Sequence, residues 1–235
     1  MERMTKHPSG GEQPPGMNEL LRELVELKKQ VAEMRASDEE RSARVDIADL
    51  ILRERMARDT YKWDEMSSYY HPESVVNVSW FLGTGAEFVE KSKGAVRPNS
   101  INFHLMTPPV VTRNLDRALA ETLCVLRSFS KVDSVDASYE GFVRIFWRAR
   151  RDDGRWLIAG LHCVYVADMF HARNPNKPPY FDEEKLAGYR DSYRYLMANL
   201  ANHGIAVRDN LVGADRPDLM ANARQTEQDW LMKRS

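Results

Sequence analysis

The chain has 235 residues, of which 43% are hydrophobic and 29% are charged, and its formal net charge at pH 7 is -1. These values are typical of one globular domain with appendages, and the near-neutral charge predicts neither a nucleic acid nor an anionic membrane surface as a partner. No run approaches the roughly 20 apolar residues of a membrane-spanning helix, and residues 1–16 lack the apolar core of a signal peptide. We therefore expect an intracellular, cytoplasmic protein.

The N-terminal region divides into a tail and a helix. Residues 1–16 are rich in Pro, Gly and charge, which predicts disorder. Residues 17–36 form a coiled-coil-like helix, because apolar side chains recur at alternating spacings of three and four: Met17, Leu20, Leu24, Leu27, Val31 and Met34. Glu23 and Lys28 fall at g and e positions that pair in a parallel interface. The helix is expected either to extend a homo-oligomer, dimer or trimer, or to lie on its own domain as a surface helix.

Short helices are predicted before the first long strands. Ser37-Asp38-Glu39-Glu40 is a capping box that restarts a helix, whose apolar face carries Ile47, Leu50, Ile51 and Met56. Another short helix begins near Lys62 and carries Tyr69 and Tyr70 until Pro72 ends it. Residues 74–81 read as a strand, and Thr84 to Glu87 caps a helix that runs to about Lys93.

The second half of the domain is rich in strands. Three long runs typical of strands are followed by the hairpin turn Asp152-Asp153-Gly154-Arg155 and a partner strand; they span 101–112, 117–129, 135–150 and 156–170. Helices followed by a meander of antiparallel strands predict an α+β fold with the helices against one face of a strongly curved sheet. We assign this domain to residues 37–172. Residues 173–235 form a helical C-terminal extension, with helices over 182–203 and 216–233, which would serve as a lid or an oligomer arm.

Most catalytic and cofactor motifs are missing from the sequence. Cys124 and Cys163 lie in apolar runs and are expected to be buried hydrophobes rather than a disulfide. The chain has no Cys/His cluster at metal-ligand spacing, no Gly-rich phosphate loop and no Gly-x-Ser-x-Gly elbow, so we predict no metal and no cofactor. The remaining chemistry is the pairing of Asp59, at a helix end, with His104, on a strand. A carboxylate that orients an imidazole can take a proton from carbon and deliver it to a leaving group.

Several motifs occur in a recognisable order. Asp59-x-x-x-Trp63-Asp64 precedes His104, which has Thr107-Pro108 behind it, and "DDGRWLIAGL" follows from residue 152. This pattern, over roughly residues 38–170, resembles the SnoaL-like branch of the nuclear-transport-factor-two-like superfamily of cone-shaped α+β barrels. Nearest in pattern are the bile-acid dehydratase, the lindane dehydrochlorinase and scytalone dehydratase, all lyases. In the first two, an Asp and a His occupy the positions of Asp59 and His104, so the resemblance implies a catalytic dyad there.

Some positions depart from these relatives. The bile-acid enzyme has a tyrosine where this chain has Glu54, which we expect to be an exposed helix residue. Phe142 and Met56 stand where scytalone dehydratase has its second catalytic histidine and its aspartate. An elimination enzyme with these departures would need substrate-binding groups of its own.

Six further residues are candidates for binding a substrate. Tyr69 and Tyr70 offer a phenol hydroxyl to a developing enolate, and Asn77 offers an inward polar group. Trp80 would form part of an apolar pocket wall, and either His162 or Tyr165 would donate to a substrate oxygen. For each of them a structural role in the core or cavity wall is the alternative.

The dyad has its own structural alternatives. His104 can be a core histidine satisfied by the backbone, and Asp59 can be a surface charge or a partner of Arg55. Inside an apolar barrel, burial lowers the pKa of an imidazole and an adjacent carboxylate raises it, so we expect His104 to titrate near neutral pH.

Together these observations predict a cofactor-independent lyase, dehydratase or isomerase. Its substrate would be a hydrophobic polycyclic or aromatic small molecule, held in the cone beside the Asp59 and His104 dyad. One alternative is a non-catalytic small-molecule binding or assembly module, since the superfamily reuses its cone for both. Another is a polyketide cyclase or a monooxygenase-like member.

Overall fold

The computed structural model describes residues 16–96, 101–132, 134–206, 208 and 210–233. Apart from Gly16, the tail predicted to be disordered lies outside these residues. The chain separates into two compact units, Met1–Ser42 and Ala43–Ser235. No helix in the described part of the chain combines the length and apolarity that crossing a membrane requires.

Helix α1 (Met17–Asp59) is one continuous helix, so the restart predicted at Ser37 is wrong. Residues 36–40 contain neither Pro nor Gly, and a polar residue in a helix interior costs only some tenths of a kcal/mol, too little to break it. Asp38 accepts instead from Arg41 one turn later, at 2.5 Å. In the first unit the side chains of the apolar seam are exposed. In the second unit, Ile47, Leu50 and Ile51 are buried as predicted, whereas Met56, which was predicted on the same face, is exposed.

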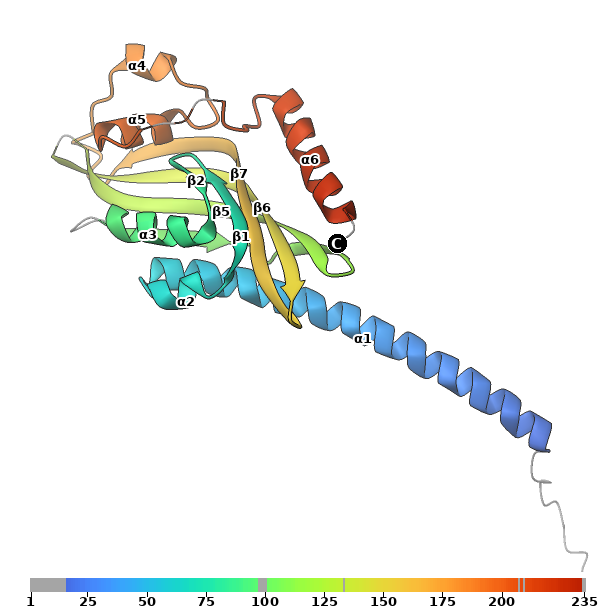
Figure 1. Cartoon of the computed structure of the whole chain (residues 1–235). Helices are drawn as coiled ribbons and strands as arrows, with labels where there is room; N and C mark the ends of the chain where they lie inside the picture. The colour runs from blue at the N-terminus through green and yellow to red at the C-terminus, as the bar shows by residue number, and fades with distance from the viewer. Residues whose placement is uncertain (1–15, 97–100, 133, 207, 209, 234–235) are drawn as a thin grey trace, which may run out of the picture. The chain divides into compact units, whose positions relative to one another are not determined.

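The second unit is built on one seven-stranded sheet in the order β2-β1-β7-β6-β5-β3, with β4 also paired to β5. The strands are β1 (Tyr70–Val78), β2 (Phe81–Gly83), β3 (Ile101–Met106), β4 (Val110–Asn114), β5 (Arg117–Val132), β6 (Val135–Asp152) and β7 (Arg155–Ala172). Helices α2 (Trp63–Ser67) and α3 (Gly85–Ala95) accompany the C-terminal part of α1. Figure 1 shows the sheet curving over α3. The predicted α+β class, with helices on a curved sheet, is confirmed.

Two strand predictions need correction. Tyr70 begins β1 instead of ending a helix, and β1 pairs with β7 in parallel, whereas the sequence predicted only antiparallel neighbours. The pairing is irregular between Tyr70 and Val75, where Pro72 has no N–H to give to the ladder. The run 101–112 is two strands, because Pro108 and Pro109 lie between β3 and β4.

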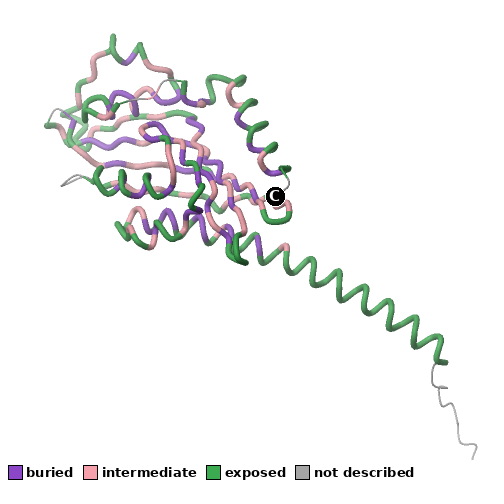
Figure 2. The backbone as a smooth tube through the Cα atoms, in the orientation of Figure 1, coloured by how far each residue is buried: buried purple, intermediate pink, exposed green. Residues whose placement is uncertain are grey.

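The remaining strand features agree with the sequence. The turn between β6 and β7 is a two-residue hairpin with positive φ at Asp153 (46°) and Gly154 (77°), as predicted. Thr84 and Glu87 form the expected capping box at the start of α3. The pairing of β6 with β7 shifts register after Phe142 and after Arg148, and bulges of this kind bend a sheet. Buried residues concentrate on these central strands (Figure 2).

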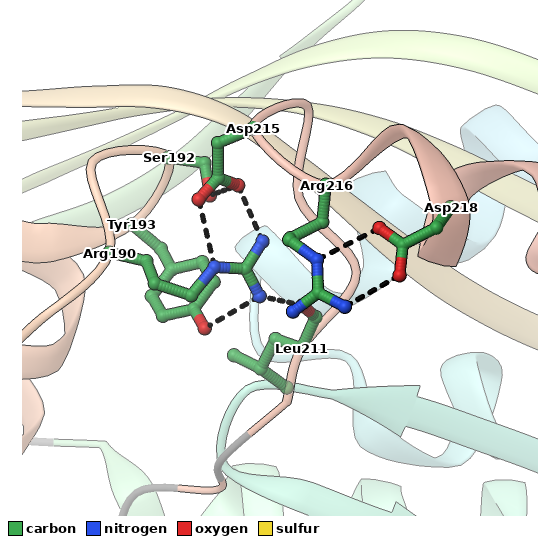
Figure 3. Close-up of polar contacts among 7 residues, drawn as sticks. All are labelled: Arg190, Ser192, Tyr193, Leu211, Asp215, Arg216 and Asp218. Carbon is green, nitrogen blue, oxygen red and sulfur yellow. Dashed lines mark hydrogen bonds and ion pairs between the residues drawn. The ribbon is translucent and has the colours of Figure 1, made fainter.

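The single helix predicted over 182–203 is instead two, α4 (Glu183–Ala187) and α5 (Arg194–Asn202). Gly188 ends α4, and the chain between the helices is held by Arg190 (Figure 3). The Arg190 guanidinium donates two hydrogen bonds to Asp215, at 2.8 and 2.5 Å, and one to the Leu211 carbonyl at 2.8 Å. Ser192 also donates to Asp215, at 2.7 Å. This network fixes α5 relative to the chain that follows it.

Helix α6 (Pro217–Met232) packs on the sheet through arginine and tryptophan side chains. The Trp230 ring contacts two guanidinium groups, those of Arg117 at 5.0 Å and Arg148 at 5.3 Å. Arg148 also donates two hydrogen bonds to the buried carboxylate of Glu227, at 2.7 and 3.1 Å. The C-terminal extension therefore contributes α6 to a face of the sheet, while α5 belongs to the cavity described next.

Candidate active site

A cavity of about 240 Å³ lies in the second unit, slightly smaller than the roughly 300–1,000 Å³ of most small-ligand sites. Its walls come from the C-terminal turn of α1, from α3, from strands β3, β5, β6 and β7, and from α5. Most of the lining is apolar, including Trp80, Phe88, Leu126, Val143 and Leu196. The cavity therefore suits a compact hydrophobic molecule.

Asp59 and His104 meet at this cavity. Asp59 is the last residue of α1, and His104 lies in β3. The distance between Asp59 Oδ1 and His104 Nδ1 is 2.7 Å, and the backbone N–H of His104 donates to Asp59 Oδ2 at 2.8 Å. Both side chains are largely buried, with 7% of His104 and 14% of Asp59 exposed. The carboxylate therefore holds the imidazole at two points.

The end of α1 places Asp59 through a strained turn. The N–H of Lys62 donates to the Ala57 carbonyl at 2.8 Å, and that of Tyr61 to the Arg58 carbonyl at 3.3 Å, which together form a Schellman motif. The residue at its left-handed position is Tyr61, with φ of 61°, where glycine is usual. A side chain in this conformation costs about 1 kcal/mol. Tyr61 lines the cavity while 47% of its surface is exposed, so its ring stands at the opening.

The geometry identifies the tautomer of His104. Burial raises the pKa of Asp59, but hydrogen bonds from His104 and the charge of Arg55 outweigh it and lower this pKa below its usual value. An ionised carboxylate can only accept, so Nδ1 carries the proton and Nε2 presents a lone pair. His104 thus has the orientation of an imidazole that accepts a proton at Nε2.

Two arginines face that lone pair; the sequence suggests Arg55 only as a partner of Asp59 and does not single out Arg58. Arg55 Nη1 lies 3.5 Å and Arg58 Nη1 3.4 Å from His104 Nε2. Both precede Asp59 within one helical turn. Once Asp59 is placed in the cavity, the i, i+4 rule would have located Arg55 on the same face.

Glu54 is buried, so the expectation that it is an exposed helix residue is wrong. It forms an ion pair with Arg55 at 3.0 Å and accepts a hydrogen bond from the Tyr70 hydroxyl at 2.7 Å. The Arg55 guanidinium also lies over the Trp147 ring at 5.2 Å. The Glu54 carboxylate thus supplies the counter-charge that lets Arg55 be buried.

The expectation that His104 titrates near neutral pH is also wrong. Burial, followed by the positive charge of Arg55, lowers the pKa of His104 to about 3, and the opposing effect of Asp59 does not compensate. Arg58 adds to the lowering. In the empty cavity His104 is therefore neutral throughout the physiological pH range.

Trp80 and Tyr165 line the cavity as predicted, and the other four binding candidates do not. The Tyr165 hydroxyl accepts from the Ser79 backbone N–H at 2.7 Å, which fixes the position of the phenol ring. Tyr69 donates to Glu65 at 2.8 Å, Tyr70 donates to Glu54, and Asn77 accepts from Arg208 at 2.5 Å.

His162 lies on the other face of the sheet from the cavity. It is near Glu227 of α6, with 3.9 Å between Nδ1 and Oε1. Strand alternation explains this position, since its neighbours Leu161 and Cys163 point into the cavity. The prediction that His162 could donate to a substrate there is wrong.

Other polar groups of the cavity could form hydrogen bonds with a ligand. Ser92 Oγ and Asn199 Oδ1 are buried and have no hydrogen-bond partner in the described part of the protein, so both are open to a ligand. Burial raises the pKa of the Cys163 thiol to about 12, which keeps it protonated and a poor nucleophile. Within the described ranges, no group of three or more His, Cys, Asp or Glu side chains is placed to hold a metal ion.

Comparison with known proteins identifies relatives of this domain. A sequence model of the SnoaL-like domain matches residues 39–162. Two proteins of Fusarium vanettenii are 26% identical: a PEP2-like protein over 142 residues and pea pathogenicity protein 2 over 143 residues. Each match covers 59% of this chain and 61% of the relative, so the chain spans less than two thirds of the length of these curated relatives.

Solved structures agree on the fold. The hexachlorocyclohexane dehydrochlorinase LinA-type3 from Novosphingobium barchaimii LL02 superposes with a TM-score of 0.52 and 17% identity, covering 60% of this chain and 97% of that one. A type 2 enzyme of the same name gives the same score and coverage at 15% identity. At this identity the likeness establishes the shared fold alone.

Proposed function

The chain belongs to the SnoaL-like domain family, and on that premise we propose that it is a cofactor-independent lyase, dehydratase or isomerase with Asp59 and His104 as its acid/base dyad. The observation that carries this proposal is the 2.7 Å contact between Asp59 Oδ1 and His104 Nδ1 at an apolar cavity. The substrate is a hydrophobic aromatic or fused-ring molecule small enough for about 240 Å³.

The chemistry follows from the tautomer. In a dehydration, His104 Nε2 takes the proton from a carbon next to a carbonyl, and the electron pair of that C–H bond moves to the enolate oxygen. The enolate then collapses to a carbon–carbon double bond as the β C–O bond breaks. The imidazolium returns its proton to the departing hydroxide, so water leaves and His104 is neutral again. Asp59 stabilises the transient imidazolium and keeps the ring in place.

Turnover of β-hydroxy bicyclic ketones would test the dyad. With a substrate found by screening such compounds for absorbance of the conjugated product, we expect Asp59→Asn and His104→Ala each to lower kcat by at least about 100-fold, the usual contribution of general acid–base catalysis. Arg53→Gln is a suitable control, because Arg53 is exposed on the same helix, pairs with Asp49 and does not line the cavity. Retention of activity in both dyad variants would overturn the mechanism.

A second candidate function is small-molecule binding without catalysis. It is favoured by the low pKa of His104, about 3, because so weak a base removes protons from carbon slowly. Tight binding of a ligand by wild-type protein, with no product and no exchange of its acidic C–H protons in D₂O, would support this candidate over the lyase.

We also propose that the N-terminal part of α1 joins copies of the chain in a parallel coiled coil. The a and d residues from Met17 to Met34 are all exposed, and Glu23 of one copy falls opposite Lys28 of another. Leu24→Glu with Leu27→Glu should convert an oligomer to a monomer in analytical ultracentrifugation, whereas Lys29→Glu, at an outer position, should not. A wild-type monomer at 100 µM, or variants that remain oligomeric, would rule the seam out as the interface.

A further inference from the structure

We propose that Arg58, with Arg55 beside it, binds an anionic oxygen of the ligand, so that the cavity selects apolar molecules carrying a carboxylate or a phenolate. The inference names a substrate class for the same site, so its part that concerns turnover rests on the proposed function. The binding itself can be tested without any turnover.

Among the residues that the structure describes around the cavity, Arg58 is a cation that forms no ion pair. Glu54 pairs with Arg55, and Asp59 pairs with His104. Arg58 forms no ion pair with any residue that the structure describes; its contacts are the long one to His104 Nε2 and a cation–π contact with Phe88 at 5.3 Å. Its Nε is buried and has no hydrogen-bond partner in the described ranges. The Arg58 guanidinium therefore has donors to spare.

A cation in this position is costly while the cavity is empty. Burial lowers the pKa of Arg58, and the nearby Arg55 lowers it further, whereas the charges of Glu54 and Asp59 oppose this lowering without cancelling it. An anion in the cavity would supply the missing counter-charge and accept charge-assisted hydrogen bonds, the strongest kind in proteins. The apolar walls formed by Trp80, Phe88 and Leu126 would hold the rest of the ligand.

The same contact would regulate the base. Arg55 and Arg58 approach His104 Nε2 and disfavour its protonation. An anion bound between the guanidinium groups offsets their positive charge at that nitrogen and makes the imidazole more basic. His104 would then be a weak base in the empty protein and a competent one when the cavity is loaded. The ligand's own charge would thus activate the group that acts on it.

Isothermal titration with 2-naphthoate and 2-naphthamide separates charge from shape, since the two probes have the same apolar body. In a low-salt buffer at pH 7, wild-type protein should bind 2-naphthoate at least about tenfold more tightly than 2-naphthamide. Arg58→Gln should abolish this preference, Arg58→Lys should retain part of it, and the control Arg53→Gln should keep it. Equal affinity of the wild type for both probes, or an unchanged preference in Arg58→Gln with a native circular dichroism spectrum, would overturn the proposal.

A spectroscopic readout tests the coupling to His104. In NMR titrations of the imidazole carbon protons, saturating 2-naphthoate should raise the pKa of His104 by at least about one pH unit, and 2-naphthamide should leave it unchanged. The absence of any rise with bound 2-naphthoate would contradict the activation step. Neither measurement uses turnover. The proposed anion site can therefore be disproved while the catalytic dyad is confirmed, and the dyad can be disproved while anion binding is confirmed.

Discussion

Replacing Glu54 with Ala should destabilise the protein by about 3–5 kcal/mol, the usual cost of removing one partner from a buried ion pair. Glu54 is completely buried, and Arg55 is 95% buried, with 5% of its surface exposed. Without the Glu54 carboxylate, the two neighbouring guanidinium groups of Arg55 and Arg58 would lose a negative charge that offsets the cost of burying them. The Tyr70 hydroxyl would lose its acceptor as well. Urea denaturation at pH 7 measures the loss directly.

Matched variants identify the cause of that loss. Glu54→Gln keeps an acceptor for Tyr70 but removes the charge. Its free energy of unfolding should therefore lie between those of the wild type and Glu54→Ala. The double variant Glu54→Leu, Arg55→Met removes both charges and should recover most of the stability. Asp49→Ala, which breaks an exposed pair with Arg53 on the same helix, should cost less than about 1 kcal/mol. If Glu54→Ala costs no more than Asp49→Ala, the buried pair is not holding Arg55 in place.

Acidification should destabilise the wild type through His104. Its pKa is about 3 in the folded protein, against an ordinary value of 6.5, so between these values the unfolded chain binds more protons. The free energy of unfolding therefore rises with pH across this window, and the stabilising contribution is complete above pH 6.5. At about 1.4 kcal/mol for each pKa unit, the contribution amounts to roughly 3–5 kcal/mol. Chemical denaturation at half-unit steps from pH 4 to 8 would reveal it.

The His104→Gln variant isolates the contribution of His104 to the pH dependence of stability. Asp168 acts in the opposite direction, because burial raises its pKa to about 6 and its contribution is lost as pH rises through that value. Asp168 is present in both proteins, so it cancels in the difference between wild type and variant. That difference should grow from pH 4 to 6.5 and then remain constant. A difference that does not change with pH would mean that His104 titrates normally in the folded protein.

The fold was largely predictable because its signals are local. Alternation along the strands, the Asp153-Gly154 turn and the capping box at Thr84 each identify an element from neighbouring residues. The parallel pairing of β1 with β7 was not predictable, since it joins residues such as Asn77 and His162 that lie far apart in the chain. The continuity of α1 was missed because residues 37–40 match the capping-box pattern of a helix start, although a helix can also run through residues of these types.

The site was predictable only in part, for a related reason. Asp59 and His104 carry recognisable chemistry, and the resemblance to a family placed them together. Arg55, Arg58 and Glu54 look like ordinary polar residues of a surface helix. Whether these residues are buried at the cavity depends on which face of α1 the sheet covers, and this is known only from the fold. The pKa of His104 was predicted wrongly because two of the charges acting on it had not been placed.

The strained turn at Tyr61 has a consequence for evolution and engineering. Glycine at this position would relieve the backbone and raise the melting temperature, yet it would remove the aromatic ring at the cavity opening. Laboratory selection for thermal resistance alone should therefore favour the loss of this tyrosine, and selection for ligand binding in the cavity should restore it. A residue on which the two pressures disagree records a trade-off between stability and activity.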